Sequence, residues 1–229
     1  MEILKLENVK YNYKSKYNVV EAVKNATASF EEGKFYAIIG RSGSGKTTLL
    51  SVMAGLDLAT DGAVYFQGKS LKEMDRDKYR RENISVIYQS FHLFPLLTAL
   101  ENVMYPMELS GVGSKEAKQK AMQLISQMGI NDQRYKNFPP MLSGGEQQRI
   151  AIARALASNS KVILADEPTG NLDTENGNNV IDILANLAHE MNYCVIIITH
   201  DLGIAQKADC VYRMTDGVLK QEQKSEISI

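Results

Sequence analysis

The sequence has little of several features that would otherwise define its class. It contains two cysteines and no stretch approaching the roughly 18 apolar residues that a membrane span needs. Two cysteines are too few for a disulfide scaffold, and Cys194 lies in an apolar run that predicts a buried, reduced thiol. The first ten residues alternate apolar and polar side chains without the apolar region of a signal peptide. We therefore expect neither disulfides nor direct membrane insertion.

The chain also lacks a surplus of positive charge. Its 26 Lys and Arg residues are balanced by 27 Asp and Glu residues, so the formal net charge is −1. Because nucleic-acid-binding proteins usually carry a basic surplus, we expect no nucleic-acid partner. Repeats, low-complexity segments and long linkers are missing as well. The 229 residues, 44% of them hydrophobic and 23% charged, suit one globular domain, or one domain with an inserted lobe.

What is present is an alternation of strand and helix signals. Short apolar segments predict strands at 3–9, 26–30, 35–39, 63–66, 84–88, 162–166 and 195–199, followed by a hairpin around Asp216-Gly217. Helices are predicted at 47–54, 144–157 and 174–190, with two more within 98–128 that are separated at 111–114. Strands that alternate with helices predict a mostly parallel sheet covered on both faces.

The helical stretch between 98 and 128 interrupts this alternation. Thr98 and Glu101 form a capping box at its start, which predicts that a helix begins there. A purely helical stretch inside an α/β chain indicates an inserted lobe. We expect a single domain over 1–229, with a helical subdomain at about 90–159 and the sheets formed by 1–89 and 160–229.

The segment from Gly40 to Thr48, GRSGSGKTT, matches the pattern G-x-x-x-x-G-K-[ST] between a predicted buried strand and a helix. Glycines let backbone N–H groups close around phosphate oxygens, and the helix N-terminus adds partial positive charge. In this pattern the lysine reaches the β- and γ-phosphates, and the next hydroxyl can bind Mg²⁺. The competing interpretation is an ordinary glycine-rich turn, but such a turn would not need a buried strand before it and a helix after it. We expect nucleotide binding by Gly40, Ser42, Gly43, Ser44, Gly45, Lys46, Thr47 and Thr48.

Residues 162–167, VILADE, predict a buried strand that ends in two carboxylates. Ligand sites of α/β proteins lie at the carboxyl ends of strands. Asp166 is placed to hold Mg²⁺ through its water shell, and Glu167 is then a candidate base for the attacking water. Taken alone, an apolar run followed by Asp-Glu is more typical of a helix cap. The phosphate-binding loop upstream favours the catalytic interpretation.

The segment 142–149, LSGGEQQR, separates this chain from kinases, GTPases, helicases and other proteins with a phosphate-binding loop. Ser143 and Glu146 form a capping box, which an ordinary helix start would explain. The Gly144-Gly145 pair is not explained in this way, because each glycine costs a helix about 1 kcal/mol. Glycines that open a helix leave N–H groups suited to an anion. The chain thus has two helix starts suited to binding phosphate, but only one of them carries a lysine, Lys46.

With these motifs the sequence resembles the nucleotide-binding subunits of ABC transporters over nearly its whole length. The Walker A motif of that family matches 40–48, its signature matches 142–149 and its Walker B motif matches 162–167. The family's D-loop matches 171–173. The resemblance implies the ABC ATPase fold, an α/β P-loop NTPase (RecA-like) core with an N-terminal antiparallel β-subdomain and an inserted α-helical subdomain.

The resemblance also implies ATP and Mg²⁺ as cofactors and assigns roles to single residues. The catalytic residues would be Glu167, the switch histidine His200 and the Q-loop glutamine Gln89, and the metal ligands Thr47, Gln89 and Asp166. Tyr13 would stack on adenine, with Tyr11 as a neighbouring alternative. Two copies would form a homodimer head to tail through ATP. The residues of one copy that complete the site around the partner's Lys46 would be Ser143, Gly144, Gly145 and Asp173.

Residues 91–103 and the wording TGNLD at 169–173 resemble the branch of macrolide exporters, lipoprotein-releasing ATPases and antimicrobial-peptide resistance transporters. The first segment is unusually apolar, which suits an exposed groove for a helix of an integral-membrane permease. Burial inside the helical lobe is the competing interpretation. The branch favours export or extraction of a lipid-like, peptide or drug substrate, with this subunit cytoplasmic and peripheral on the inner face of the membrane through the permease.

Two other functions are compatible with an ABC ATPase. One is a soluble ATPase acting on DNA or ribosomes, but such proteins usually carry paired nucleotide domains, a long coiled coil or zinc modules, and this sequence has none of them. The other is the ATPase of a membrane signalling or cell-division complex that does not transport. The identity of the permease would distinguish that function from transport.

Overall fold

The larger of two sheets has six strands in the order β10-β9-β3-β8-β7-β6. The computed structural model describes residues 1–15 and 17–223. The strands are β3 (Phe35–Ile39), β6 (Ile84–Tyr88), β7 (Val162–Asp166), β8 (Cys194–Thr199), β9 (Cys210–Thr215) and β10 (Val218–Glu222). All neighbours in this sheet pair in parallel except β10, which returns antiparallel to β9. The predicted mostly parallel sheet is confirmed.

The central strands of this sheet are buried on both faces, and their side chains divide between two apolar cores. In β3, Tyr36 and Ile38 join one core, while Phe35, Ala37 and Ile39 join the other. Successive side chains of a strand point to opposite faces, so a strand covered on both faces needs a continuous apolar run. This requirement accounts for the uninterrupted apolar sequence of β3.

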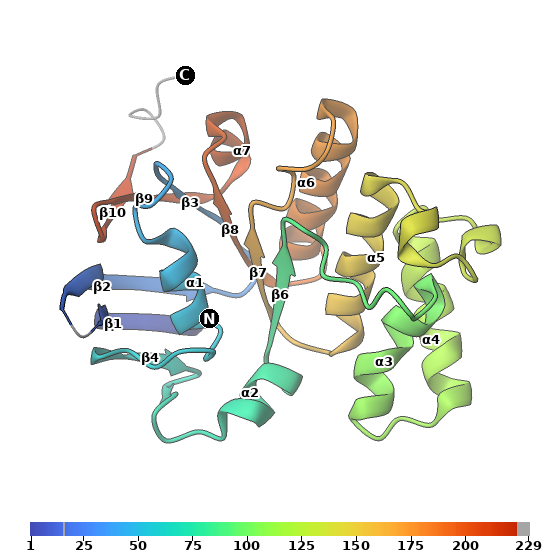
Figure 1. Ribbon diagram of the computed structural model, residues 1–229, viewed down its shortest axis with the longest axis horizontal. Helices are drawn as coiled ribbons and strands as arrows, with labels where there is room; N and C mark the ends of the chain where they lie inside the picture. Colours follow the sequence, from blue (N-terminus) through green and yellow to red (C-terminus); the bar gives the residue numbers. More distant parts are fainter. Residues whose placement is uncertain (16, 224–229) are drawn as a thin grey trace.

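The smaller sheet is antiparallel and has the strand order β2-β1-β4-β5. Its strands are β1 (Glu2–Lys14), β2 (Val19–Glu31), β4 (Asp61–Phe66) and β5 (Lys69–Ser70). Helix α1 (Lys46–Met53) lies between the two sheets, and Leu49, Leu50 and Met53 pack into the core that both sheets share (Figure 1). β1 and β2 run further than predicted because they continue as an exposed hairpin, where Val19 and Val20 are solvent-accessible.

On the other face of the six-stranded sheet, α5 (Gly144–Ala157) packs beside β6 and α6 (Thr174–His189) packs beside β3 and β8. α3 (Ala99–Leu109) and α4 (Ser114–Gln127) pack on α5. Short 3₁₀ turns at Asp132–Arg134 and Pro139–Met141 connect α4 to α5. Both predicted capping boxes are present, at Thr98 and at Ser143. Within the described ranges, none of the helices has the length and apolar character that a membrane crossing requires.

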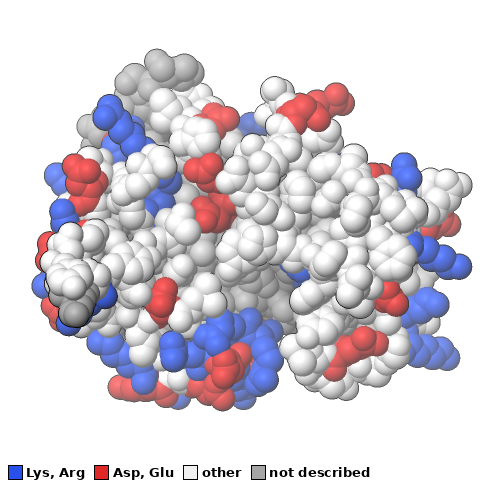
Figure 2. Space-filling model, viewed as in Figure 1, with Lys and Arg blue, Asp and Glu red and all other residues white. Residues whose placement is uncertain are grey.

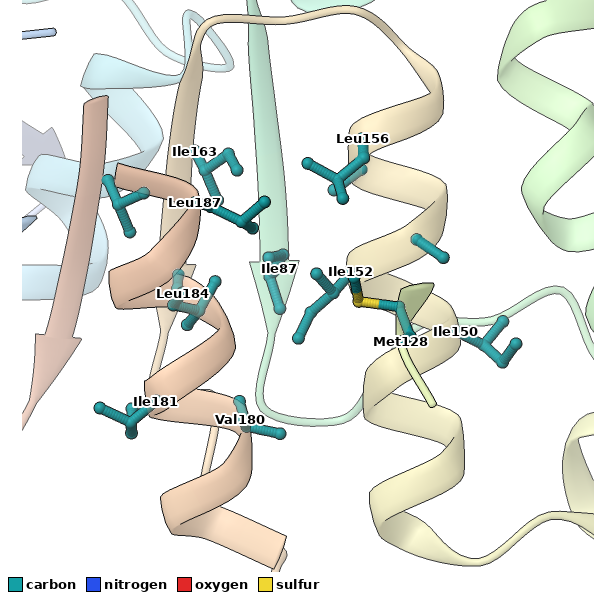
Figure 3. Packing of buried hydrophobic residues seen from close by; sticks show 14 of the residues in the cluster. Ile87, Met128, Ile150, Ile152, Leu156, Ile163, Val180, Ile181, Leu184 and Leu187 are labelled. Carbon is teal, nitrogen blue, oxygen red and sulfur yellow. The ribbon is translucent and has the colours of Figure 1, made fainter. Parts of the chain in front are cut away.

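One apolar cluster runs from these helices into the sheet. Ile152 of α5 lies beside Ile87 of β6, and Ile163 of β7 lies beside Leu187 of α6 (Figure 3). The cluster therefore includes residues from both sides of the predicted boundary at about residue 159. The division into a helical subdomain and a sheet-bearing part stays a prediction.

Two short helices were not predicted, α2 (Arg76–Glu82) and α7 (Leu202–Lys207). Both are too short to display a helical period, and α2 buries a single side chain, that of Tyr79. Each begins at an aspartate, Asp75 or Asp201, whose carboxylate accepts hydrogen bonds from backbone N–H groups of the first turn. N-cap aspartates are a helix-start signal, but one that turns share.

The loop before α3 is held by one buried amide. Asn102 is 0% exposed, and its Oδ1 accepts a hydrogen bond from the Phe94 backbone N–H at 2.8 Å. Its Nδ2 lies 3.1 Å from the Phe94 carbonyl and 3.0 Å from the carbonyls of Leu97 and Thr98. The side chain closes the loop on itself. As a result Leu96 projects with 86% of its surface exposed.

We predict that Asn102→Ala destabilises the fold by about 2–4 kcal/mol, since it removes three or four hydrogen bonds worth roughly 0.5–1.5 kcal/mol each. Urea unfolding followed by circular dichroism measures the change. The matched control is Asn179→Ala, an exposed position of α6, which should stay within about 0.5 kcal/mol of the parent. Equal stability of the two variants would contradict the bridging role of Asn102.

Candidate nucleotide site

The glycine-rich loop between β3 and α1 is shaped by two close approaches of backbone. A side chain at Gly45, which has a φ of 103°, would place its Cβ 2.2 Å from the Ala22 carbonyl oxygen. A Cβ at Gly40 would lie 2.3 Å from the carbonyl oxygen of Met214. The backbones of β2 and β9 thus pack directly against the loop, and no residue larger than glycine fits at either position. The loop forms the cradle that its sequence predicts.

Lys46 lies inside this cradle and is 6% exposed. Its Nζ donates hydrogen bonds to the carbonyl oxygens of Gly40 at 2.8 Å and Arg41 at 2.9 Å. Burial lowers the pKa of Lys46, and the nearby carboxylates of Glu167 and Asp166 oppose that shift. The ammonium group is therefore held within the loop with only carbonyl partners, and it can turn to a phosphate.

The loop also contains a buried hydroxyl. Ser44 is 6% exposed, and its Oγ has no hydrogen-bond partner among the described residues. Buried hydroxyls without a partner are uncommon because desolvation is unfavourable. A phosphate oxygen in the cradle would supply the acceptor, so Ser44 fits an anionic ligand.

A pocket of about 500 Å³ opens beside the loop. The side chain of Tyr13 lines it, half-exposed, with its hydroxyl 3.1 Å from Thr48 Oγ1. Tyr11 packs edge-on against Tyr13 at 5.0 Å between ring centroids but does not line the pocket. The geometry favours Tyr13 over Tyr11 as the aromatic that a base could stack on.

Part of the pocket wall comes from residues that sequence reasoning did not identify. Lys24 of β2 donates its backbone N–H to the Gly217 carbonyl at 2.7 Å, which joins β2 to the turn between β9 and β10. The lining residues that were not predicted are Val20, Glu21, Ala22, Lys24, Asp216 and Gly217. Asp216 and Gly217 were predicted only as a hairpin turn, and no local pattern places any of the six at a nucleotide pocket, because they reach it through the pairing of distant strands.

Asp166 and Thr47 lie together at the end of β7. Burial raises the pKa of Asp166, while a hydrogen bond with the Thr47 side chain acts in the opposite direction. A hydroxyl and a carboxylate beside a phosphate cradle are oxygen ligands of the kind that Mg²⁺ prefers. These two residues fit the predicted metal site.

Glu167 and His200 face each other across neighbouring strands. Glu167 has a φ of 44°, and its backbone N–H donates to the Ile198 carbonyl at 2.9 Å. Its Oε2 is 3.2 Å from Nδ1 of His200. A non-glycine residue in the left-handed region is strained, and such strain collects at functional sites. Glu167 also lines the pocket.

Gln89 follows β6 at the same sheet edge, but its side chain turns to the loop after β7. Its Nε2 lies 2.5 Å from the position that a Cβ on Gly170 would occupy. The Asn171 side-chain Nδ2 donates to the Gln89 carbonyl at 3.0 Å. The predicted Q-loop and D-loop are thus in contact within one chain.

The predicted site divides into two groups. One group gathers around the pocket and its edge: the glycine-rich loop with Lys46, Tyr13, Asp166, Glu167, His200 and Gln89. The other group is at the start of α5 and α6, where Ser143 and Asp173 are the N-cap residues. Ser143, Gly144, Gly145 and Asp173 do not line the pocket. The structure of one chain leaves these four residues apart from the cradle.

Comparison with known proteins agrees with these motifs. Residues 23–170 match the family described as ABC transporter. The chain belongs to this family. The uncharacterized ABC transporter ATP-binding protein MJ0796 of Methanocaldococcus jannaschii is 40% identical over 228 residues, 97% of each chain. The lipoprotein-releasing system ATP-binding protein LolD of Saccharophagus degradans is 41% identical over 223 residues, covering 96% of this chain and 97% of that one.

Solved structures place this ABC ATPase among ATP-binding cassettes. A dimeric, post-hydrolysis structure of MJ0796 bound to ADP and Pi superposes with a TM-score of 0.89 at 36% identity and covers 97% of this chain. The alignment covers 99% of the MJ0796 chain. A second dimeric MJ0796 structure gives the same TM-score. These comparisons confirm the predicted family, the predicted ABC ATPase fold and the predicted ATP hydrolysis.

We predict that Ser44→Ala weakens ATP binding by about tenfold to a hundredfold, because a hydrogen bond to a charged group contributes roughly 1.5–3 kcal/mol. The same variant should leave the stability of the nucleotide-free chain unchanged or slightly higher, because it removes a buried hydroxyl without a partner. Isothermal titration calorimetry and urea unfolding measure the two quantities. Ser126→Ala, an exposed position of α4, is the control for both. Unchanged ATP affinity would contradict a phosphate contact at Ser44.

Proposed function

We propose that this ABC ATPase drives a separate integral-membrane permease by closing and opening an ATP-dependent dimer. The observation that supports this most directly is the separation of the two anion-binding helix starts. The α1 start carries the cradle and Lys46, whereas the α5 start carries Ser143 and Gly145 away from the pocket. Two copies placed head to tail would bring the α5 start of each to the cradle of the other.

In the closed dimer, the two chains share each ATP molecule. Lys46, Ser44 and the loop N–H groups bind the phosphates of ATP in their own chain, and Tyr13 stacks on adenine. Ser143 and the N–H groups of Gly144 and Gly145 bind the γ-phosphate from the partner copy, with Asp173 beside them. Thr47, Asp166 and Gln89 would hold Mg²⁺, which when bound would neutralise charge on the phosphate oxygens.

Hydrolysis requires a water molecule in line with the γ-phosphorus. Glu167 accepts a proton as this water attacks, the bond from the γ-phosphorus to the bridging oxygen breaks, and ADP is the leaving group. His200, 3.2 Å from the Glu167 carboxylate, contacts the γ-phosphate and orients the base. Loss of the γ-phosphate removes the shared ligand, so the dimer opens.

A second hollow supports permease binding. Figure 2 shows it between the surfaces that α2 and α3 form, and Lys and Arg side chains gather over α2. The groove has a volume of about 380 Å³ and apolar walls from Leu56, Val86, Phe94 and Tyr105. Arg80 and Arg154 also line it, while no Asp or Glu does. An amphipathic permease helix with an acidic residue would match this surface.

His92 and Phe94 of the segment that resembles the macrolide-export, lipoprotein-release and peptide-resistance branch line this groove. Phe94 and Leu96 of that segment are exposed, whereas Ala99 and Val103 are buried in the helical lobe, so only the exposed part of the segment is available to a permease. We infer export or extraction of a lipid-like, peptide or drug substrate. The subunit would then be peripheral on the cytoplasmic face of the membrane.

We predict that Glu167→Gln keeps ATP binding but lowers the hydrolysis rate by at least about a hundredfold, the usual contribution of general base catalysis. The amide cannot accept the proton, so the ATP-bound dimer should accumulate. Phosphate release measures the rate, and size-exclusion chromatography with ATP measures the dimer. Near-normal turnover would exclude Glu167 as the base.

We predict that Ser143→Arg blocks ATP-driven dimerisation and leaves nucleotide binding to the monomer within about twofold, because the residue contacts only the partner's ATP. Chromatography of the Glu167→Gln form with and without Ser143→Arg measures the first effect, and nucleotide titration measures the second. Lys46→Ala is the contrasting variant and should abolish nucleotide binding itself. Loss of monomer binding in Ser143→Arg would overturn the trans contact.

A further inference from the structure

Gly145, in the first turn of α5, packs directly against a side chain of α6. A Cβ at this position would lie 2.4 Å from Oδ1 and 2.7 Å from Cγ of Asn176. Gly145 is buried, and its backbone is outside the left-handed region, so its conformation does not require glycine. The close approach of the Asn176 carboxamide is what excludes a side chain here.

The same carboxamide connects α5 to the start of α6. Its Nδ2 donates to Oδ2 of Asp173 at 2.7 Å, while its Oδ1 lies 3.4 Å from Nη1 of Arg149 on α5. Oδ1 of Asp173 accepts the backbone N–H of Asn176 at 2.9 Å. Asp173 is therefore held from two sides by one residue, and that residue also touches the signature helix.

Hydrogen bonds from Asn176, first from its backbone and then from its side chain, lower the pKa of Asp173. The D-loop aspartate thus stays ionised as the N-cap of α6. Among the described residues it has no ion pair with Lys or Arg, so its orientation depends on these amide contacts.

We propose that Asn176 is a positioning residue that fixes the D-loop carboxylate Asp173 relative to the signature residues Ser143 and Gly145. The two groups then enter the partner's ATP site as one unit. This inference rests on the proposed head-to-tail dimer, because only there do Ser143 and Asp173 meet an ATP molecule.

The proposal gives Gly145 a role within its own chain. If Gly145 were needed only for close approach of the partner's γ-phosphate, an added methyl group would be harmful whatever residue is at 176. If the approach of Asn176 is the constraint, shortening Asn176 should make room for that methyl group. Asn176→Ala removes the two nearest atoms, Oδ1 and Cγ, and leaves the Asn176 Cβ 3.2 Å from the added methyl group.

The test uses the full chain in the Glu167→Gln background and compares the parent with Gly145→Ala, Asn176→Ala and the double variant. The readout is the ATP concentration that gives half-maximal dimer in size-exclusion chromatography. We expect Gly145→Ala to raise it by about tenfold or more, the effect of overpacking a close contact. Asn176→Ala should raise it less, and the double variant should behave like Asn176→Ala. A double variant as impaired as Gly145→Ala, or more so, overturns the proposal.

A second variant tests the hydrogen bonds and does not depend on Gly145→Ala folding. Asn176→Asp keeps an acceptor for Arg149 but cannot donate to Asp173, and it places two carboxylates together. In the Glu167→Gln background we expect Asn176→Asp to weaken ATP-driven dimerisation severalfold. In the chain that keeps Glu167, it should lower the kcat of ATP hydrolysis. Nucleotide binding to the monomer should be unchanged. Asn179→Ala, also on α6, is the control. Parent-like dimerisation of both Asn176→Asp and Asn176→Ala would overturn the positioning role.

The failure of this inference and the failure of the proposed dimer give different results. If the Glu167→Gln parent itself does not dimerise with ATP, the head-to-tail arrangement is wrong. If the parent dimerises and the Asn176 variants match it, or Asn176→Ala does not suppress Gly145→Ala, the dimer stands and only the role of Asn176 is lost.

Discussion

The site depends on the in-register parallel pairing of β3, β8, β7 and β6. Ile38, Ile198, Asp166 and Tyr88 form one row across the sheet. Because all four strands run the same way, the residues just beyond that row arrive together at one edge: Gly40, His200, Glu167 and Gln89. A one-residue slip in any pair would turn its alternate side chains to the wrong core and displace its functional residue at once.

A second constraint is close backbone packing, which several glycines permit in different ways. Gly45 combines a left-handed φ with a carbonyl neighbour, whereas Gly145 and Gly170 have ordinary backbones and instead lie against the amides of Asn176 and Gln89. Gly145 and Gly170 are therefore required by contacts within the chain, the first between α5 and α6 and the second between Gln89 and the loop after β7. Because a packed side-chain amide cannot overlap its neighbour, a movement of the segment that carries Asn176 or Gln89 can displace the glycine packed against it.

Much of this arrangement was predictable because it is local in sequence. β3, β6, β7 and α5 were predicted with their observed ends, since a buried strand needs an apolar run and Ser143 marks its helix start. The pocket wall at Lys24 and Gly217 was not predictable, because it forms by pairing of segments nearly two hundred residues apart. α2 was missed because one buried tyrosine in a seven-residue polar helix leaves no period. The Asn176 contact was missed for a related reason: an asparagine in a first helical turn is ordinary until its neighbour is seen.

The glycine-rich loop and the starts of α5 and α6 are held in place by different kinds of contact. This difference matters for the proposed ATPase cycle. The cradle is fixed by backbone contacts from β2 and β9 and is ready before any ligand arrives. The α5 and α6 starts are fixed to each other by polar contacts among Arg149, Asn176 and Asp173, and in the proposed dimer they meet ATP only when a partner copy arrives. Under the proposed mechanism, binding energy from the γ-phosphate is therefore available for bringing two preformed surfaces together. Because little of it is needed to order either surface, its loss on hydrolysis can separate them.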